Sequence, residues 1–538
     1  MAQQSVSALQ ANAEAALQDQ TNILAFKKLM IVFSVLSISL IVSYIDQSAL
    51  GILLSSMGED LDAQATISWA ATSSMIANTT FQVLYGRLSD IFGRKYIYLS
   101  AVFLLFVSEI LTSVARTSTQ LYAFRGMAGV ATGGINALTM IIVSDVVTLR
   151  NRGKYQGILG SCIGLGNTVA PFISAGIIKH TWRLLYWILG PCAFVCFVIS
   201  FPFIPLSIEK ASFKSKLKKI DTLGTILSSI FVIFTLIPVS SGGIIFAWNS
   251  ALVISFLCIG GVAFLIFLYV EWKVSLLPMV PFRLLKNSIC SALYIQIFFS
   301  GCMYYAQMNL VPVYYQVVMD YSVIVSAALT IPMVAIQAMT SVITGFIMTL
   351  TGKYGYIIAF GYFSLTVGTA IQLGTFTKNL NKGAAIVALG LQGIGIGCTF
   401  QPSLVALQAN SAKADRAIVI SVRGLIRAFG GAVGLAVASA ILSNTLISNI
   451  PEDVPQSIRD QMQYSVYSIP DLSGLTIHQK DLVLDAYALA HRAVFIFYVP
   501  LMALSFGLCF WVQDTGLERA EEKREIPTEL TDVSASDS

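Results

Sequence analysis

The chain has 538 residues, of which 56% are hydrophobic and only 11% are charged, and its mean hydropathy is +0.76. A soluble protein usually carries about twice that fraction of charged residues, so the composition excludes an ordinary water-soluble globule and predicts lipid as the main solvent. The net charge of +5 does not indicate nucleic-acid binding, because the basic residues lie in short segments between apolar runs.

The apolar runs predict an all-α polytopic membrane protein. Backbone polar groups in lipid must be paired within the protein, which leaves helices or a closed barrel. Runs of roughly 20 residues fit helices better than the roughly ten alternating residues of a barrel strand. No cleavable signal peptide is expected, because residues 1–26 are polar and rich in Gln and Ala. We expect fourteen spans, at residues 29–56, 67–89, 96–115, 119–147, 155–178, 184–206, 221–240, 250–272, 288–318, 322–350, 354–376, 384–408, 418–447 and 491–513.

Two segments fall outside this pattern, a basic linker at 207–220 and a long polar loop at 448–490. If the N-terminus lies inside, the inner segments hold about three times as many lysines and arginines as the outer ones, and such an excess marks the cytosolic side. We therefore expect cytosolic tails at residues 1–28 and 514–538.

An internal repeat indicates two related halves. Gly86 and Gly93 lie between the second and third spans, and Gly345 and Gly352 stand at the same spacing between the tenth and eleventh. Transporters are often built from such repeats. The predicted organisation is a six-helix bundle at 29–206, two inserted helices at 221–272 and a second six-helix bundle at 288–513.

The strongest local motif runs from Gly86 to Lys95 and reads GRLSDIFGRK. Gly86 and Gly93 allow helix ends to approach closely and turn, and Asp90 can accept charge-assisted hydrogen bonds from Arg94. A pair of this kind can close the inner face in one state and break in the other. The simpler alternative is a tight loop whose basic residues anchor it at the cytosolic surface.

At this motif the chain resembles the major facilitator superfamily, with matches at Gly86, Leu88, Asp90, Gly93, Arg94 and Lys95. The fourth span resembles the family's arginine motif at Arg125, Gly126, Gly129, Gly133 and Gly134. The fifth resembles its antiporter motif at Gly160, Gly164, Gly166 and Pro171, and departs from it at Ala170, Ser174 and Ala175.

Other stretches resemble the fourteen-span drug:proton antiporter branch of that family, especially its fungal members. They include Trp182, Arg183 and the run from Arg427 to Gly434. The resemblance implies the major facilitator fold, with two six-helix bundles and a two-helix insertion, and secondary transport without a cofactor.

Charged residues inside the spans point to the coupling mechanism, because each costs about 2.5–3.5 kcal/mol at a helix centre. Asp46 in the first span and Arg125 in the fourth are expected to share one space towards the outer half. Because arginine cannot practically lose its proton, Asp46 would carry the transported proton. The resemblance implies the same coupling role for the two charges. The alternative is a static ion pair that fixes helix packing.

Three other charges are expected to have simpler roles. Glu109, near the outer end of the third span, is expected to reach the lipid headgroups. Arg423 is expected to anchor the thirteenth span at the inner interface, and Arg427, which lies among glycines, is expected to face protein.

Glycines four residues apart recur in equivalent spans of the two halves and let helix backbones touch. Ordinary tight packing explains them, and rocking of one half against the other would also need them. The pairs are Gly129 and Gly133, Gly160 and Gly164, Gly393 and Gly397, and Gly430 and Gly434.

Polar and aromatic side chains within apolar spans are the candidates for lining a substrate cavity. A cavity lined by amides and tyrosines with little charge suits bulky, weakly charged amphiphiles. It suits small anions less well, because these are usually bound by arginine. The three histidines have no metal-ligand spacing, so no metal is expected. The candidates are Asn78, Gln82, Asn136, Asn167, Gln296, Tyr304, Tyr305, Gln307, Asn309, Gln337, Gln392 and Gln401.

The sequence thus predicts a secondary transporter, and not an enzyme, that exports drugs, toxins or secondary metabolites in exchange for protons by alternating access. The alternatives are a vacuolar transporter of amino acids or other metabolites and, more distantly, a transporter-like nutrient sensor. An ATP-driven pump is disfavoured, because the chain lacks G-x-x-x-x-G-K-[ST]. We expect a monomer in the plasma membrane or, as the second choice, in the vacuolar membrane. The expected partners of the protein are a small organic substrate, protons and lipid, but no nucleic acid.

Overall fold

The computed structural model describes residues 23–64, 66–178, 180–205, 221–241, 246, 248–275, 277–377, 381–450, 455 and 475–517. All regular elements of this part of the chain are helices, which confirms the all-α prediction. The basic linker predicted at 207–220 lies outside the described residues, as does most of each predicted terminal tail.

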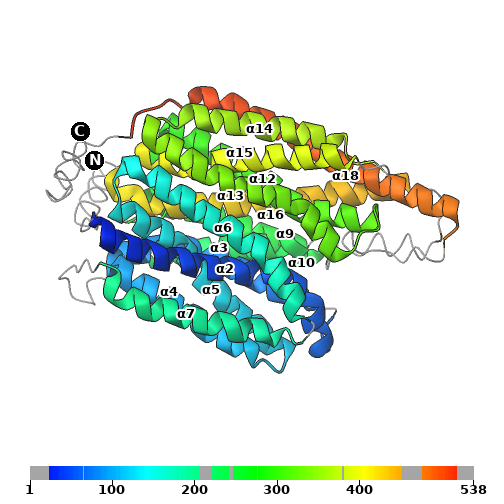
Figure 1. The fold of residues 1–538 in the computed structure, drawn as a ribbon, viewed down its shortest axis with the longest axis horizontal. Coiled ribbons are helices and arrows are strands. Elements are labelled where there is room, and N and C mark those ends of the chain that lie inside the picture. The colour runs from blue at the N-terminus through cyan, green and yellow to red at the C-terminus, as the bar shows by residue number, and fades with distance from the viewer. Residues whose placement is uncertain are drawn as a thin grey trace.

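The N-terminal group of helices comprises α2 (Phe26–Asp60), α3 (Ser68–Phe92), α4 (Arg94–Ser113), α5 (Ser118–Val146), α6 (Leu149–Ile177) and α7 (Arg183–Phe203). Two further helices follow, α9 (Thr222–Ser241) and α10 (Ala251–Lys273), and then the short α11 (Phe282–Lys286). The C-terminal group comprises α12 (Ser288–Val317), α13 (Val323–Thr351), α14 (Gly355–Leu373), α15 (Lys382–Ala409), α16 (Arg416–Asn449) and α18 (Ile477–Leu508). Figure 1 shows that α2 begins and α18 ends at the same end of the molecule, called here the termini end.

Thirteen helices of the described residues are long and apolar enough to cross a membrane, and α3 is the long helix that does not meet this measure. Its polar residues explain why, since Ser74, Thr79 and Gln82 are all buried in it. The helix packs against α5, α9 and α16. A helix enclosed by other helices needs less apolar surface than one that faces lipid.

The last long helix starts earlier than expected, at Ile477 rather than at 491. Its start is set by a capping box. The Thr476 hydroxyl accepts a hydrogen bond from the backbone N–H of Gln479, and the Gln479 side chain accepts one from the backbone N–H of Thr476. The boundary predicted from hydropathy missed this local signal, so part of the loop predicted at 448–490 is helix.

Each group has its own apolar core. In the N-terminal group, residues such as Leu36, Leu138 and Trp182 are almost fully buried in one cluster. In the C-terminal group, a second cluster includes Tyr362 and Phe495. The helices α9 and α10 pack on each other, and α9 also contacts both α3 and α16. The inserted helices therefore lie across both groups.

The two groups meet at several helix contacts, and small residues lie at the two most extensive of these, α6 with α13 and α3 with α16. A Cβ atom on Gly157 of α6 would overlap the backbone oxygen of Ser341, and one on Gly345 of α13 would overlap that of Gly153. A Cβ on Gly86 of α3 would overlap the Ser421 side chain. The absence of side chains at these positions is what lets the backbones approach.

The glycine pairs singled out in the sequence also lie at helix contacts. They bring α5 against α3 at Ser74 and Asn78, α6 against α13 at Ala338 and Ser341, α15 against α13 at Met333 and Gln337, and α16 against α12 at Phe298 and Cys302. Only the α6 pair lies between the two groups; the others pack helices within one group.

Replacing Gly157 with Ala is expected to destabilise the contact between α6 and α13. The new methyl group would overlap a backbone atom that cannot rotate away, and overpacking of this kind costs roughly 1–3 kcal/mol. The measurement is the thermal unfolding midpoint of the purified protein in detergent. Gly176→Ala on the same helix is the control, because nothing lies within 4 Å of its Cβ position. Equal midpoints for the two variants would contradict the importance of this contact.

Candidate functional site

The Gly86–Lys95 motif forms the turn between α3 and α4 at the termini end. Gly93 has a φ of 96°, which favours glycine, and it separates the two helices. Arg94 Nη1 lies 2.6 Å from Asp90 Oδ1, and Arg94 Nε lies 2.8 Å from Asp145 Oδ2. Lys95 does not join this network, since its Nζ lies over the Phe201 ring of α7.

The same network crosses from the N-terminal to the C-terminal group. Arg416 Nη1, at the start of α16, lies 3.0 Å from Asp145 Oδ1 and 3.1 Å from the backbone oxygen of Ser144. Asp145 on α5 is therefore shared between Arg94 and Arg416. Because these side chains are only 4–11% exposed, the electrostatic attraction within each ion pair is stronger than it would be in water.

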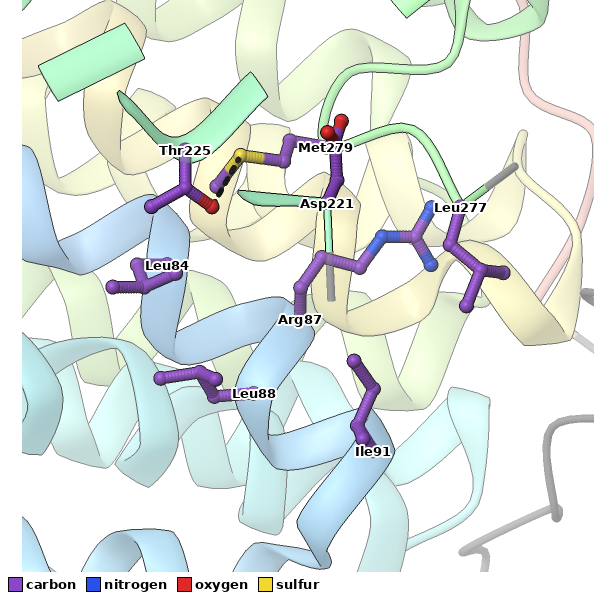
Figure 2. Close-up of a pocket in the computed structure, with 8 residues that line it drawn as sticks. All are labelled: Leu84, Arg87, Leu88, Ile91, Asp221, Thr225, Leu277 and Met279. Carbon is purple, nitrogen blue, oxygen red and sulfur yellow. Dashed lines mark hydrogen bonds between the residues drawn. The ribbon is translucent and has the colours of Figure 1, made fainter. Parts of the chain in front are cut away.

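Arg87 connects the motif to the inserted helices. Its Nε donates a 2.9 Å hydrogen bond to the backbone oxygen of Pro278, and its Nη2 donates to the same atom. Figure 2 shows the Arg87 side chain reaching from α3 towards the segment that contains Leu277 and Met279. Glu271, at the end of α10, accepts a 3.0 Å bond from the backbone N–H of Val280 in this segment. A movement of α3 would therefore be transmitted to α10.

The predicted charges Asp46 and Arg125 meet in the interior of the N-terminal group. Arg125 Nη1 lies 2.6 Å from Asp46 Oδ1, and its Nη2 donates a 2.9 Å bond to Asp46 Oδ2. Both side chains are 0% exposed. The fork geometry is the strongest form of an arginine–carboxylate pair, and the Tyr186 ring covers the guanidinium at 5.4 Å.

Glu109 belongs to the same cluster, so the expectation that it reaches the headgroups is wrong. Its side chain is 0% exposed and interacts with both Asp46 and Arg125. It lies in α4 one turn before Ser113, where that helix ends, and at that depth the neighbouring α7 covers it through Gly190. Counting residues back from the helix end would have placed Glu109 below the membrane surface.

The cluster holds two carboxyl groups and one guanidinium. With both carboxyls ionised it carries one net negative charge in a buried place, and one added proton makes it neutral. Unpaired buried charge is strongly disfavoured. The arrangement can therefore take up a single proton and release it again when its surroundings change.

A second group of polar residues lies where α2 faces α12 and α16. Arg427 of α16 lies 5.2 Å from the centre of the Phe400 ring and interacts with Tyr44, Tyr304 and Tyr305. Tyr44 comes from the N-terminal group and lies within hydrogen-bonding reach of the guanidinium. The expectation that Arg427 faces protein fits these contacts.

Arg423, one turn earlier on α16, is 5% exposed and donates a hydrogen bond to the backbone oxygen of Phe400. Its expected role as an anchor at the membrane surface is therefore wrong. The expectation rested on its distance from the start of the span, but α16 begins at Arg416, so Arg423 lies two turns inside the helix.

Several other candidates also lie between the groups or near them. Gln82 packs against Gly424 of α16, and Gln401 packs against Gly160 of α6. Gln337 is a hydrogen-bond neighbour of Tyr304. Of these amides, Gln337 places a polar side chain beside the tyrosines that interact with Arg427.

Two candidates, Gln296 and Gln392, form hydrogen bonds to neighbouring helices of the C-terminal group. Gln296 donates a 2.8 Å bond to the backbone oxygen of Ser505 in α18, and Gln392 donates to the Gln372 side chain in α14.

Five further candidates either form a hydrogen bond within their own group of helices or have a buried polar atom without a partner among the described residues. Asn78 donates to the Thr132 hydroxyl at 2.9 Å, the Ser48 hydroxyl donates to Asn167 at 2.6 Å, and Asn309 donates to the backbone oxygen of Tyr305 at 2.8 Å. Both amide atoms of Gln307 and the oxygen of Asn136 are buried without a hydrogen-bond partner among the described residues.

The remaining antiporter-like residues lie on α6. Gly166 packs against Tyr44 of α2, and Pro171 lies inside the helix. In the part of the chain that the structure describes, no group of three or more His, Cys, Asp or Glu side chains could hold a metal ion.

Known proteins with similar sequences are transporters. Residues 36–435 match the Major Facilitator Superfamily. The chain is 41% identical to Citrate exporter 1 of Yarrowia lipolytica, over 94% of this chain and 75% of that protein. It is 37% identical to the MFS-type transporter clz4 of Cochliobolus lunatus, over 95% and 90%. It is 29% identical to the vacuolar membrane amino acid uptake transporter fnx2 of Schizosaccharomyces pombe, over 77% and 72%.

Solved structures show the same fold at low identity. The human organic anion transporter MFSD10 superposes with a TM-score of 0.54 at 14% identity, over 89% of this chain and 98% of that one. The proton:xylose symporter XylE superposes with a TM-score of 0.58 at 12% identity, over 92% and 98%. The helical fold, the family match and these similarities agree: the chain is an integral membrane transporter of the major facilitator superfamily.

Proposed function

We propose that the protein exports small organic compounds in exchange for protons, by alternating access. The observation that carries this proposal is the buried cluster of Asp46, Glu109 and Arg125. Its two carboxyl groups and one guanidinium become neutral when one proton is added. The similarity to Citrate exporter 1 of Yarrowia lipolytica supports export over uptake.

Within the cluster we assign the transported proton to Glu109 and a positioning role to Asp46. The sequence predicted Asp46 as the residue that carries the proton. In the structure, however, Arg125 forms a bidentate ion pair with both carboxylate oxygens of Asp46. Glu109 is left as the second carboxyl of a site with one cation. A proton entering from outside would neutralise Glu109, and its release towards the cytosol would restore the negative charge.

The second part of the mechanism is the network of Asp90, Arg94, Asp145 and Arg416. We assign the termini end to the cytosol, because lysines and arginines concentrate there. The ion pairs and the close glycine contacts then hold the cytosolic side shut in this structure, and substrate would enter from the cytosol only after these contacts separate. Opening this side breaks the Asp145–Arg416 pair and parts α3 from α16.

The second candidate is vacuolar transport of amino acids. The 29% identity to fnx2, a vacuolar membrane amino acid uptake transporter, supports this second candidate. We place the protein in the plasma membrane as the first proposal and in the vacuolar membrane as the second. Export into medium, against loading of isolated vacuoles with labelled amino acids, separates the two.

Replacing Glu109 with Gln is expected to uncouple transport from protons. The amide imitates the protonated carboxyl and cannot release a proton, so accumulation driven by an imposed pH gradient should fall by about tenfold or more, while exchange of substrate for substrate continues. The measurement uses purified protein in liposomes, with citrate as the first labelled probe. Glu59→Gln, at the exposed outer end of α2, is the control.

Asp46→Asn separates the two carboxyl roles. It removes the partner of a fully buried guanidinium, and breaking a buried pair costs roughly 3–5 kcal/mol, so we expect lower thermal stability as well as lower transport.

A Glu109→Gln protein that keeps full gradient-driven accumulation would overturn the assignment of the proton to Glu109.

Replacing Asp145 with Asn is expected to loosen the cytosolic contacts. Arg94 would keep Asp90, but Arg416 would lose its ionic partner on α5, so the helix ends should open more often. Hydrogen exchange followed by mass spectrometry should show amides at the end of α3 and the start of α16 exchanging several-fold faster, on the order of a loss of 1–2 kcal/mol.

Asp60→Asn is the matched control, because the Asp60–Arg183 pair lies at the opposite end and within the N-terminal group. Its exchange at the end of α3 should equal that of the unchanged protein. If Asp145→Asn also left that exchange unchanged, the network would not be a gate.

A further inference from the structure

Two positive charges of α16 lie one turn apart at the contact between the two groups. Arg427 is partly exposed and stacks on Phe400, and Arg423 is buried beside it. The two guanidinium groups are close enough to repel each other. Side chains four residues apart on a helix share a face, so both arginines point towards the same region of the interface.

Neither arginine forms an ion pair with a carboxylate of the described residues, in contrast to Arg125 and Arg416. Arg125 is paired with Asp46, and Arg416 with Asp145. Besides each other, the groups that act on Arg423 and Arg427 are tyrosine side chains: Tyr44 from α2, Tyr304 and Tyr305 from α12, and Tyr362 from α14. Arg423 Nε has no hydrogen-bond partner in the part of the chain that the structure describes.

Two like charges in a place of low polarity are costly, because each loses hydration and they repel each other. A small anion that enters from water would supply the missing counter-charge. The fork of a guanidinium matches a carboxylate with two parallel hydrogen bonds. The surrounding hydroxyl and amide groups would bind the remaining oxygens of such a molecule.

We propose that Arg427 and Arg423 bind a small organic polycarboxylate, with the Tyr44 hydroxyl donating to it from the opposite group. One carboxylate lies on the free edge of Arg427, and a second takes up the charge of Arg423. The proposal rests on the proposed function, because the export direction comes from there, and it names the substrate class. It replaces the weakly charged amphiphile expected from the sequence.

The position of the site explains how substrate would influence alternating access. Tyr44 belongs to the N-terminal group, and both arginines belong to the C-terminal group, so a bound anion connects the two. Tyr44 lies two residues from Asp46 on α2 and packs against Gly166 of α6. Occupancy at the centre and protonation of the Asp46 cluster therefore act on the same segment of α2.

The test is the thermal unfolding midpoint of the purified full-length protein, titrated with citrate, with its neutral trimethyl ester and with inorganic phosphate. A ligand that binds the folded protein raises the midpoint. Citrate should raise it, and the ester and phosphate should not. Arg427→Gln should weaken the apparent citrate affinity by about tenfold or more. Arg423→Gln should weaken it by several-fold, since that charge is already partly satisfied by Phe400.

Arg116→Gln is the matched control, because Arg116 lies exposed in the turn between α4 and α5 and should leave the citrate titration unchanged. Two milder variants keep the test decisive if Arg427→Gln does not fold. Arg427→Lys keeps the charge but loses the fork, and Tyr44→Phe removes only a hydroxyl; each should weaken citrate binding by a few-fold.

The proposal is overturned if citrate does not raise the midpoint of the unchanged protein, if Arg427→Lys and Tyr44→Phe both bind citrate unchanged, or if phosphate or a cationic amphiphile gives the same Arg427-dependent shift. Binding and transport can fail separately. Arg427-dependent citrate binding without gradient-driven transport contradicts the proposed function alone. Gradient-driven export of an uncharged compound without citrate binding contradicts the polycarboxylate site alone.

Discussion

Charge buried among lipid-facing helices must be balanced within the protein, and this constraint organises the structure. Asp46 and Arg125 are both fully buried and meet in a two-point ion pair. Glu109 adds a second carboxyl to a site that has one guanidinium. A site of this composition has two states that differ by one proton, and each state favours a different electrostatic environment. The proposed coupling depends on that difference.

At the centre of the molecule the buried charge that needs balancing is positive rather than negative. Arg423 and Arg427 carry positive charge into the contact between the groups without a carboxylate from the described residues. An anionic substrate would complete this site, as a proton completes the other. Moving an anion out of a cell and a proton in both follow an inside-negative potential, which supplies about 2.3 kcal/mol per charge at 100 mV. The two sites thus fit one direction of transport.

Hydropathy and motif spacing predicted the helical architecture, the Asp46–Arg125 pair and the contact of Asp90 with Arg94, because each depends on residues whose chemistry is costly in lipid. They missed Glu109 and Arg423. Both lie within a turn or two of a helix end, where a residue count alone does not distinguish a buried side chain from one at the surface. Which neighbouring helix covers such a residue is decided by packing, here by α7 at Gly190 and by Phe400 of α15.

The most direct measurement of coupling is proton movement in liposomes that contain the purified protein and a pH-sensitive dye, at a clamped membrane potential. When a citrate gradient is imposed without a pH gradient, we predict that protons move against the flow of citrate, at a rate proportional to it. Citrate flow that leaves the internal pH unchanged would contradict proton exchange at the Asp46, Glu109 and Arg125 cluster.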